Sequence, residues 1–334
     1  MLALSPLGLG TYLGDEGPEA DARYAAAAIR FHALGGNAFD TAANYRGGRS
    51  ERALGRAFER LARESTFVST KAGYLPMGDG ITEESPKAWF QRVLLGPGIL
   101  RPEEVIDGCH SLAPRYLAHQ LGVSLEAMGL GSVNLFHLHN PEHARPRLGP
   151  RIFDEVLLEA FRACEALVAD GKTEAYGVAT WSGFRVMPDR PDHLSLERLL
   201  ELAEQAGGRD HHFRWIQLPL NLGMAEAHLV ATQSFGGRMM TPLAAAQAAG
   251  LHVQTSASML QARVLPQIAE QLDALRPFFP GCESPAQMAL QFTRSCPGVT
   301  VALCGMGQVA HVEENAKVLG LPPLDPASLA GLFG

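Results

Sequence analysis

Short apolar runs of strand length alternate with longer stretches of helical periodicity along most of this chain. In the helical stretches apolar residues recur three and four positions apart, as in Leu54, Ala57, Phe58 and Leu61. The runs of strand length fall at residues 7–11, 37–41, 66–71, 133–140, 174–180, 214–221, 251–257 and 300–305. Strands that alternate with helices form parallel sheets, so this pattern predicts an α/β fold, a closed (β/α)8 TIM barrel with long βα loops.

Residues typical of helix ends support these boundaries. A helix over 19–34 ends at Gly35, and Ser50 is expected to cap the helix after the second strand. The alternative fold is an open, doubly wound sheet, which needs a G-x-G-x-x-G turn that opens a helix. The segment "GLGTYLG" at 8–14 has glycines, but no helix opens directly on it. We therefore predict one barrel domain over residues 1–334.

Two long connections interrupt the alternation. Residues 73–105 are rich in Gly and Pro and are too long for a plain βα loop, and residues 222–240 form a second such stretch. Long loops of compact domains are frequent sites of binding and catalysis. We predict that both segments shape a substrate pocket.

Composition narrows the class of protein. Apolar residues make up 46% of the 334 positions and charged residues 19%, which excludes an intrinsically disordered chain. The net charge is -7 and no block of Lys or Arg exists, which argues against nucleic acid and anionic membranes as partners. The N-terminal sequence lacks signal-peptide features, and no apolar run reaches the ~18 residues of a membrane span. The five scattered cysteines have no metal-binding spacing, so we expect a cytoplasmic protein with free thiols.

Chemically versatile side chains stand where the predicted strands end. Asp40 ends the second strand, and Tyr45 follows five residues later. Lys71 ends the third strand and His139 the fourth. His137 shares the face of His139 by the period of two, but His139 lies nearer the strand exit. Because the carboxyl ends of barrel strands meet at one mouth, an acid, a phenol, an amine and an imidazole are predicted to converge there.

In their order along the chain, these motifs resemble those of the aldo-keto reductase family, from about Leu7 to Asn315. "GLGT" opens the barrel, "FDTAANYRGGRSE" supplies the acid and the phenol, "STKAGY" the amine and "FHLHNPE" the imidazole. "GKTEAYGVATWS" and "VEEN" are similar to further family motifs. The matching order at successive strand ends makes the resemblance specific.

The resemblance implies an oxidoreductase that interconverts an aldehyde or ketone with an alcohol by hydride transfer. It implies that Tyr45 donates the proton and that the Lys71 ammonium lowers the pKa of that phenol. Asp40 would hold Lys71 charged and in place, and His139 would hydrogen-bond the substrate oxygen. Two alternatives share the barrel: a catalytically weak subunit that binds or senses the cofactor, and a sugar or polyol dehydrogenase.

The family cofactor is a nicotinamide dinucleotide, so the resemblance implies NADP, with NAD as the alternative. The cofactor-binding positions that it implies are Gly10, Thr11, Asp40, Thr180, Gln217, Ser256, Arg263, Gly305, Gly307, His311, Glu314 and Asn315. The pattern departs near the seventh strand, where Thr255 takes the place of an aromatic residue and Gln261 that of a glycine. His311 replaces an arginine, which would pair more strongly with a 2′-phosphate.

The substrate pocket is expected to draw on the same mouth and on the long loops. The expected pocket residues are Tyr12, Tyr45, Trp89, His139 and Trp181. Residues 210–212 (Asp-His-His) have the residue types of a metal site, but they fall in a polar loop between a helix and a strand. We therefore expect no metal site there. The resemblance implies a small carbonyl or alcohol as the substrate.

Overall fold

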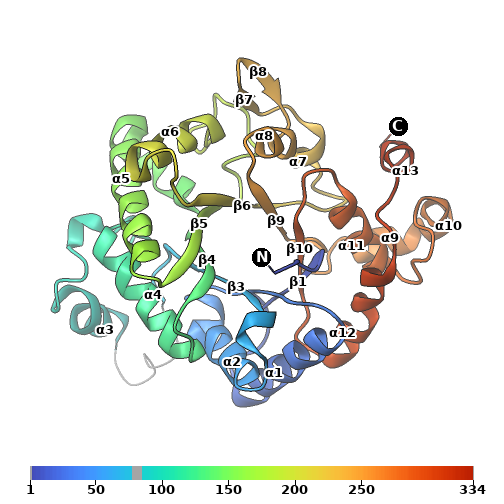
Figure 1. Cartoon of the computed structure of the whole chain (residues 1–334), viewed down its shortest axis with the longest axis horizontal. Helices are drawn as coiled ribbons and strands as arrows, with labels where there is room; N and C mark the ends of the chain where they lie inside the picture. Colours follow the sequence, from blue (N-terminus) through green and yellow to red (C-terminus); the bar gives the residue numbers. More distant parts are fainter. Residues whose placement is uncertain (1, 77–84, 334) are drawn as a thin grey trace.

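Eight parallel strands close into a barrel in the computed structural model, which describes residues 2–76 and 85–333 (Figure 1). The barrel strands are β1 (Leu7–Gly10), β2 (Ala38–Asp40), β3 (Phe67–Ala72), β4 (Val133–His139), β5 (Thr173–Ala179), β6 (Phe213–Pro219), β9 (His252–Ser256) and β10 (Val301–Gly305). Around the barrel they follow the order β1-β10-β9-β6-β5-β4-β3-β2. Every strand predicted from the sequence is present, and the predicted (β/α)8 architecture is confirmed.

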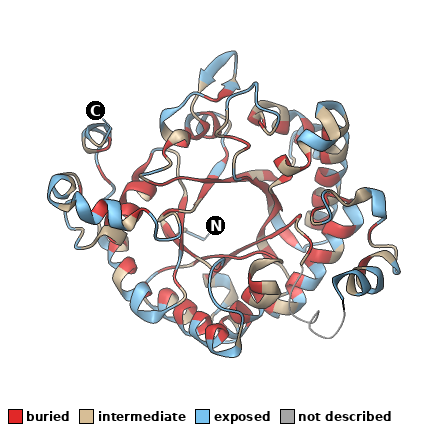
Figure 2. Cartoon of the chain, turned by 180° about the vertical axis from the view of Figure 1, so that it is seen from behind, coloured by how far each residue is buried: buried red, intermediate tan, exposed pale blue. Residues whose placement is uncertain are grey.

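Helices surround the barrel and cover the outer face of its strands (Figures 1 and 2). The longer ones are α1 (Pro18–Ala33), α2 (Arg49–Phe58), α4 (Pro114–Met128), α5 (Arg145–Ala169), α6 (Leu196–Gly207) and α11 (Pro285–Ser295). The shorter ones are α3 (Pro86–Phe90), α7 (Glu226–Leu229), α8 (Pro242–Ala248), α9 (Leu265–Glu270), α10 (Leu272–Leu275), α12 (Val309–Asn315) and α13 (Pro326–Gly331). Buried residues gather on the strands and on the inward helix faces (Figure 2), and every residue of β3 is buried. Burial of both strand faces explains why apolar and polar residues do not alternate strictly along the strands in the sequence.

The second helix begins before the residue predicted to cap it. α2 starts at Arg49 with Gly48 in front, so Ser50 lies inside the helix. The Ser50 hydroxyl instead donates to the carbonyl oxygen of Thr11 at 2.7 Å. The predicted cap was wrong because Gly47 and Gly48 adopt left-handed backbone angles and bring the chain into the helix ahead of the serine.

The two long connections contain secondary structure of their own. Residues 222–240 hold α7 and an antiparallel hairpin of β7 (Gln233–Phe235) and β8 (Arg238–Met240), which stands at the periphery of the barrel (Figure 1). In the stretch 73–105, residues 77–84 lie outside the described residues, and α3 occupies part of the remainder. The hairpin was not predicted, because three-residue strands are too short to show a period of two.

The structure also bears on two expectations from the sequence, the absence of a membrane span and the free cysteines. Across residues 2–76 and 85–333, no helix combines the length and apolar character needed to cross a bilayer. The five cysteines are free, as predicted, and three of them are buried.

Candidate active site

Asp40, Tyr45 and Lys71 meet inside the mouth of the barrel. The Lys71 Nζ lies 2.6 Å from Asp40 Oδ2 and 3.3 Å from Tyr45 Oη. It also donates to the carbonyl oxygen of Thr41 at 2.8 Å. Because Lys71 is 1% and Asp40 3% exposed, water and salt screen this ion pair little. The acid, phenol and amine singled out from the sequence therefore form one cluster.

The backbone that leads to Tyr45 stays paired with β3 beyond the end of β2. The Thr41 N–H donates to the carbonyl oxygen of Ser69 at 3.0 Å, and the Ala43 N–H donates to that of Lys71 at 3.1 Å. These bonds keep the segment along β3 until the turn that carries the phenol. The Tyr45 hydroxyl faces the Lys71 amine because hydrogen bonds align the two segments.

A buried ion-pair cluster fixes the turn directly after the phenol. Arg46 has a left-handed backbone, φ 51°, and its Nη2 lies 2.7 Å from Asp21 Oδ1 and 2.7 Å from the carbonyl oxygen of Asp15. Its guanidinium carbon lies 5.1 Å from the ring centroid of Tyr24, and Arg49 Nη2 lies 2.6 Å from Asp21 Oδ2. A left-handed residue other than glycine costs about 1–2 kcal/mol, which these contacts offset. We refer to Asp21, Arg46 and Arg49 as the rim cluster.

His139 is the last residue of β4 and brings the imidazole to the phenol. Its ring centroid lies 5.8 Å from that of Tyr45. Its carbonyl oxygen lies 2.8 Å from His110 Nε2, and its own Nδ1 is buried without a hydrogen bond to the described residues. Gly73 permits this arrangement, because a Cβ there would lie 2.6 Å from the His139 carbonyl oxygen.

Burial and nearby charges set the protonation states. Burial raises the pKa of the Tyr45 phenol; the Lys71 ammonium lowers it, as predicted, but burial outweighs that effect and the net pKa lies above 10.0. Burial lowers the pKa of Lys71, but Asp40 and Tyr45 outweigh it and hold that pKa above 10.5. Burial, reinforced by Lys71, lowers the pKa of His139 well below 6.5. At neutral pH the site therefore holds a neutral phenol, a charged ammonium and a neutral imidazole.

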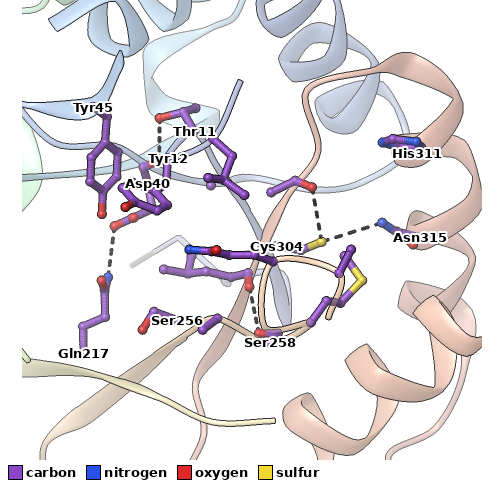
Figure 3. Close-up of a pocket in the computed structure, with 18 of the residues that line it drawn as sticks. Thr11, Tyr12, Asp40, Tyr45, Gln217, Ser256, Ser258, Cys304, His311 and Asn315 are labelled. Atoms are coloured by element: carbon purple, nitrogen blue, oxygen red, sulfur yellow. Dashed lines mark hydrogen bonds between the residues drawn. The ribbon is translucent and has the colours of Figure 1, made fainter. Parts of the chain in front are cut away.

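A cavity of about 1090 Å³ opens beside this cluster and extends to α12 (Figure 3). The predicted site residues that line it are Gly10, Thr11, Tyr12, Asp40, Tyr45, His139, Thr180, Trp181, Gln217, Ser256, Gly305, His311, Glu314 and Asn315. Tyr45 and Gln217 lie at one end, and His311 and Asn315 at the other (Figure 3). Unlike His139, His137 does not line the cavity, and its Nε2 lies 3.0 Å from Gln254 Oε1.

Four residues predicted for the site do not line the cavity, and one of them is Lys71, which reaches the site through its 3.3 Å contact with Tyr45. Arg263 is exposed to solvent and does not line it. Gly307 is explained by packing, because a Cβ there would lie 2.9 Å from the Tyr24 ring. Trp89, predicted as a pocket wall, packs against the hydrophobic core from α3. Arg263 and Gly307 were expected from family motifs and Trp89 from its place in a long loop, and loop geometry is not fixed by the barrel.

The segment after β9 clarifies where the family pattern departs. Ser256 lines the cavity, whereas Thr255 points to the opposite side of the strand and cannot take the place of the stacking aromatic residue. Gln261 lines the cavity with φ 55°, and Ala262 follows with φ 66°. Glycine adopts this left-handed conformation freely, which agrees with the glycine expected at this point of the chain.

Two cavity residues near the cluster were missed from the sequence. The Tyr74 ring centroid lies 5.2 Å from that of His139, and the Tyr74 hydroxyl oxygen accepts from Asn140 Nδ2 at 3.4 Å. Both residues line the cavity. Tyr74 follows Lys71 by three positions and Asn140 follows His139 directly, so reading slightly past each strand end would have found them.

Buried polar atoms without partners remain at both ends of the cavity. Thr180 Oγ1 and Asn315 Oδ1 make no hydrogen bond to the described residues. Gln217 differs, because its Nε2 donates to Asp40 Oδ1 at 3.1 Å and to Gln254 Oε1 at 2.9 Å. An unpaired buried polar atom is unfavourable, so the two free atoms favour a long ligand with polar groups at both ends.

Two known protein sequences are similar to this chain. A Schizosaccharomyces pombe protein named "Putative voltage-gated potassium channel subunit beta" is 25% identical over 319 residues, which cover 86% of this chain and 76% of that protein. The rat aflatoxin B1 aldehyde reductase member 2 is 30% identical over 187 residues, which cover 54% of this chain and 40% of the reductase.

Solved structures share the fold at lower identity. An aldo/keto reductase from Klebsiella pneumoniae, in complex with NADP and acetate, superposes with a TM-score of 0.65 at 20% identity, covering 98% of this chain and 90% of that one. An aldo-keto reductase from Bacillus halodurans gives a TM-score of 0.64 at 18% identity, covering 98% and 91%. The sequence model of the Aldo/keto reductase family matches residues 6–189, more than half of the chain, and this protein therefore belongs to that family.

Proposed function

We propose that this chain is an NADP(H)-dependent reductase that interconverts an aldehyde or ketone with an alcohol, with Tyr45 as the proton donor. The observation that carries the proposal is the 3.3 Å contact between Tyr45 Oη and Lys71 Nζ beside the cavity. Carbonyl reduction adds a hydride to carbon and a proton to oxygen. It therefore needs a donor that is protonated at working pH and a group that stabilises the donor's conjugate base.

Tyr45 and Lys71 meet these two needs. The raised pKa of Tyr45 keeps its phenol protonated until the substrate oxygen develops negative charge. The Oη proton then moves to that oxygen, and the Lys71 ammonium stabilises the phenolate that remains. Asp40 keeps the ammonium in place through its 2.6 Å contact, and the phenolate regains a proton from solvent.

His139 contributes a hydrogen bond without a charge. Its lowered pKa leaves the imidazole neutral, so one ring nitrogen donates to the substrate oxygen. With its ring centroid 5.8 Å from that of Tyr45, it would hold the carbonyl within reach of the phenol. Tyr12, Tyr74 and Trp181 line the adjoining wall and would contact the rest of the substrate.

The cavity suits a nicotinamide dinucleotide. When bound, this cofactor supplies the hydride. Thr180 Oγ1 and Asn315 Oδ1, which have no hydrogen-bond partner among the described residues, fit the polar groups of such a molecule, and Gly305 lines the cavity with backbone alone. NADP is the first choice because the Klebsiella pneumoniae relative is described in complex with NADP, and His311 is the basic side chain at the far end.

Tyr45→Phe tests the proposal directly. We expect kcat for carbonyl reduction to fall roughly 10²–10⁴-fold, because the proton donor is lost, while fluorescence titration shows unchanged NADPH binding. Tyr176→Phe is the matched control, since that tyrosine is also buried and lies off the cavity. Wild-type turnover in Tyr45→Phe would contradict the proposed role.

The Schizosaccharomyces pombe relative, which is named as a channel subunit, supports a second candidate function. In it, this chain is a subunit that binds the cofactor and has only weak catalytic activity. That function predicts tight binding of NADPH or NADH, negligible wild-type turnover on a panel of aldehydes, ketones, sugars and polyols, and no kinetic effect of Tyr45→Phe. The same panel separates carbonyl reduction from sugar or polyol oxidation.

A further inference from the structure

A layer of polar side chains lies inside the barrel next to the Asp40 carboxylate, where such barrels are usually filled with branched apolar residues. Ser69 Oγ lies 2.8 Å from Asp40 Oδ1, and Gln254 Nε2 lies 3.3 Å from Ser69 Oγ. His137 Nε2 and Gln217 Nε2 both contact Gln254 Oε1, at 3.0 Å and 2.9 Å. Ser69, His137 and Gln254 are 0% exposed, so these groups depend on one another for hydrogen bonds.

The carboxylate fixes the direction of every bond in this layer. Asp40 is paired with Lys71 and can only accept, so the Ser69 hydroxyl donates to it. The Ser69 oxygen then accepts from the Gln254 amide nitrogen, which turns Gln254 Oε1 toward His137. An amide oxygen only accepts, so His137 must carry its hydrogen on Nε2.

The His137 imidazole is neutral, so it carries only one N–H, and the tautomer decides which nitrogen can donate. Burial, followed by the charge of Lys71, lowers the pKa of His137 to about 4, which leaves one N–H at neutral pH. Space for the ring is made by Gly177 on the neighbouring strand, where a Cβ would lie 2.8 Å from His137 Nδ1. The ring is therefore held by packing with Nε2 directed at Gln254.

We propose that His137 and Gln254 are positioning residues that act on the active site through Ser69 and Asp40. The donor chain from His137 through Gln254 and Ser69 holds Asp40 in the rotamer that places the Lys71 ammonium beside Tyr45. Gln217, whose amide also donates to Asp40 Oδ1, braces the same carboxylate oxygen from β6 (Figure 3). The catalytic part of this inference rests on the proposed function.

Stability alone does not account for the layer. Replacing a fully buried polar network with apolar side chains of similar volume is often neutral or stabilising. The network instead ends on the Asp40 carboxylate, which contacts Lys71, and each donor in the chain binds the next member on the way to that carboxylate. A device that sets the rotamer of Asp40 needs this directionality, whereas a space-filling core does not.

The tautomer is tested by ¹⁵N-histidine NMR at pH 7, with the His137 signals assigned by their loss in His137→Gln. We expect wild-type His137 to show a protonated Nε2 and an unprotonated Nδ1. In Gln254→Met the acceptor is gone, and we expect this preference to weaken. Thr255→Val is the matched control, because its buried hydroxyl has no hydrogen-bond partner among the described residues and points to the opposite side of β9. A wild-type His137 protonated on Nδ1, or on both nitrogens, would overturn the donor chain.

Steady-state kinetics with NADPH and a carbonyl substrate test the positioning role. In Gln254→Met and His137→Leu we expect kcat to fall roughly 10- to 100-fold, with KM and the NADPH dissociation constant within about twofold of wild type. His137→Gln retains an N–H donor and should recover most of the lost kcat. Thr255→Val should match wild type, and melting temperatures should show that all variants are folded.

The outcomes separate this inference from the proposed function. Unchanged kcat in folded Gln254→Met, or equal losses in His137→Gln and His137→Leu, would overturn the positioning role while leaving the reductase assignment intact. If the wild type turns over no substrate of the panel, the reductase assignment fails, and the donor chain is then judged on the imidazole signals alone.

Discussion

Two buried carboxylates lie on either side of the Tyr45 loop, and they are held in different ways. Asp40, at the end of β2, contacts one cation among the described residues, the Lys71 ammonium, and accepts further hydrogen bonds from uncharged side chains inside the barrel. Asp21, on α1, contacts the two guanidinium groups of Arg46 and Arg49. The two carboxylates are almost equally inaccessible, at 3% and 1% exposure.

The difference lies in how each cation responds when charge changes nearby. A buried lysine can release its proton, whereas an arginine stays charged at any pH the folded protein meets. A lysine pair therefore suits a site where a phenol becomes a phenolate and back. Two arginines on one carboxylate suit a turn that must not move. Loss of Asp40 should thus affect turnover most, and loss of Asp21 should affect stability most.

Asp40→Asn is the strongest test of this contrast. We expect kcat to fall roughly 10²–10³-fold, because Lys71 loses the charge that keeps it protonated and close to Tyr45. The free energy of unfolding should fall less than in Asp21→Asn, since the buried amine can become neutral. Steady-state kinetics and urea unfolding of the same preparations measure both quantities. Wild-type kcat in Asp40→Asn would remove the distinction between the two carboxylates.

Asp21→Asn should show the opposite balance. Its free energy of unfolding is expected to fall by about 3–5 kcal/mol, because Arg46 and Arg49 stay charged beside an uncharged amide. Well below the melting temperature, kcat should remain within about threefold of wild type. Asp15→Asn is the control: its carboxylate is 92% exposed and 3.7 Å from Arg23, and a surface pair of this kind contributes about 0–1 kcal/mol.

The pH dependence of stability in acid gives a second test of the rim cluster. Burial raises the pKa of Asp21, but hydrogen bonds and charges from Arg49 and Arg46 outweigh it and hold the pKa below 3.8. A depressed folded-state pKa means that the stabilisation is complete above about pH 4 and is lost as the pH falls through the lower value. The stability difference between wild type and Asp21→Asn should therefore shrink only in strong acid. A difference that already shrinks near neutral pH would contradict the assignment.

The barrel was predictable because its signal is local. Each strand is a short apolar run between polar turns, and each neighbouring helix repeats its apolar residues every three or four positions. The exceptions are equally physical. The hairpin of β7 and β8 is exposed over much of its length and too short to show a period. The start of α2 depends on left-handed angles at residues 46–48, and the Arg46 angle is stabilised by Asp21, far away in the sequence.

That Asp40, Tyr45 and Lys71 meet at the mouth was predictable because strand ends converge in any parallel barrel. Asp40, Lys71 and His139 needed only the strand boundaries and the family motifs. The donor chain through Gln254 was not predictable, because contacts across the barrel interior depend on strand stagger. No local pattern encodes that stagger, although the period of two does place His137 on the face of His139. Arg263 does not line the cavity, and its position depends on a loop that the barrel does not constrain.

A third buried carboxyl sharpens the comparison, because its described partners are backbone amides in place of a cation. Glu142 Oε1 accepts from the N–H groups of Trp181 and Ser182 at 2.7 Å and 3.2 Å, and its Oε2 has no hydrogen-bond partner among the described residues. Burial raises its pKa to about 7, against an ordinary value of 4.5, and the backbone donors offset this only in part. No cation among the described residues therefore offsets the cost of burying a charged Glu142 carboxylate, as Lys71 does for Asp40 and the two arginines do for Asp21.

Glu142→Gln converts this difference into a measurable pH dependence. A raised folded-state pKa means that the wild type is most stable below about pH 4.5 and loses stability as the pH rises through about 7. Glutamine cannot ionise, so the free energy of unfolding of Glu142→Gln, relative to that of wild type, should rise by roughly 1–3 kcal/mol between pH 5 and pH 8. Urea unfolding at both pH values measures the change, and Glu155→Gln, at an exposed ion pair with Arg151, should show almost none. The stability difference between Glu142→Gln and wild type could instead be the same at both pH values. Backbone amides alone would then stabilise a buried carboxylate as well as Lys71 or the rim cluster does. The contrast between Asp40 and Asp21 would then no longer depend on the kind of cation.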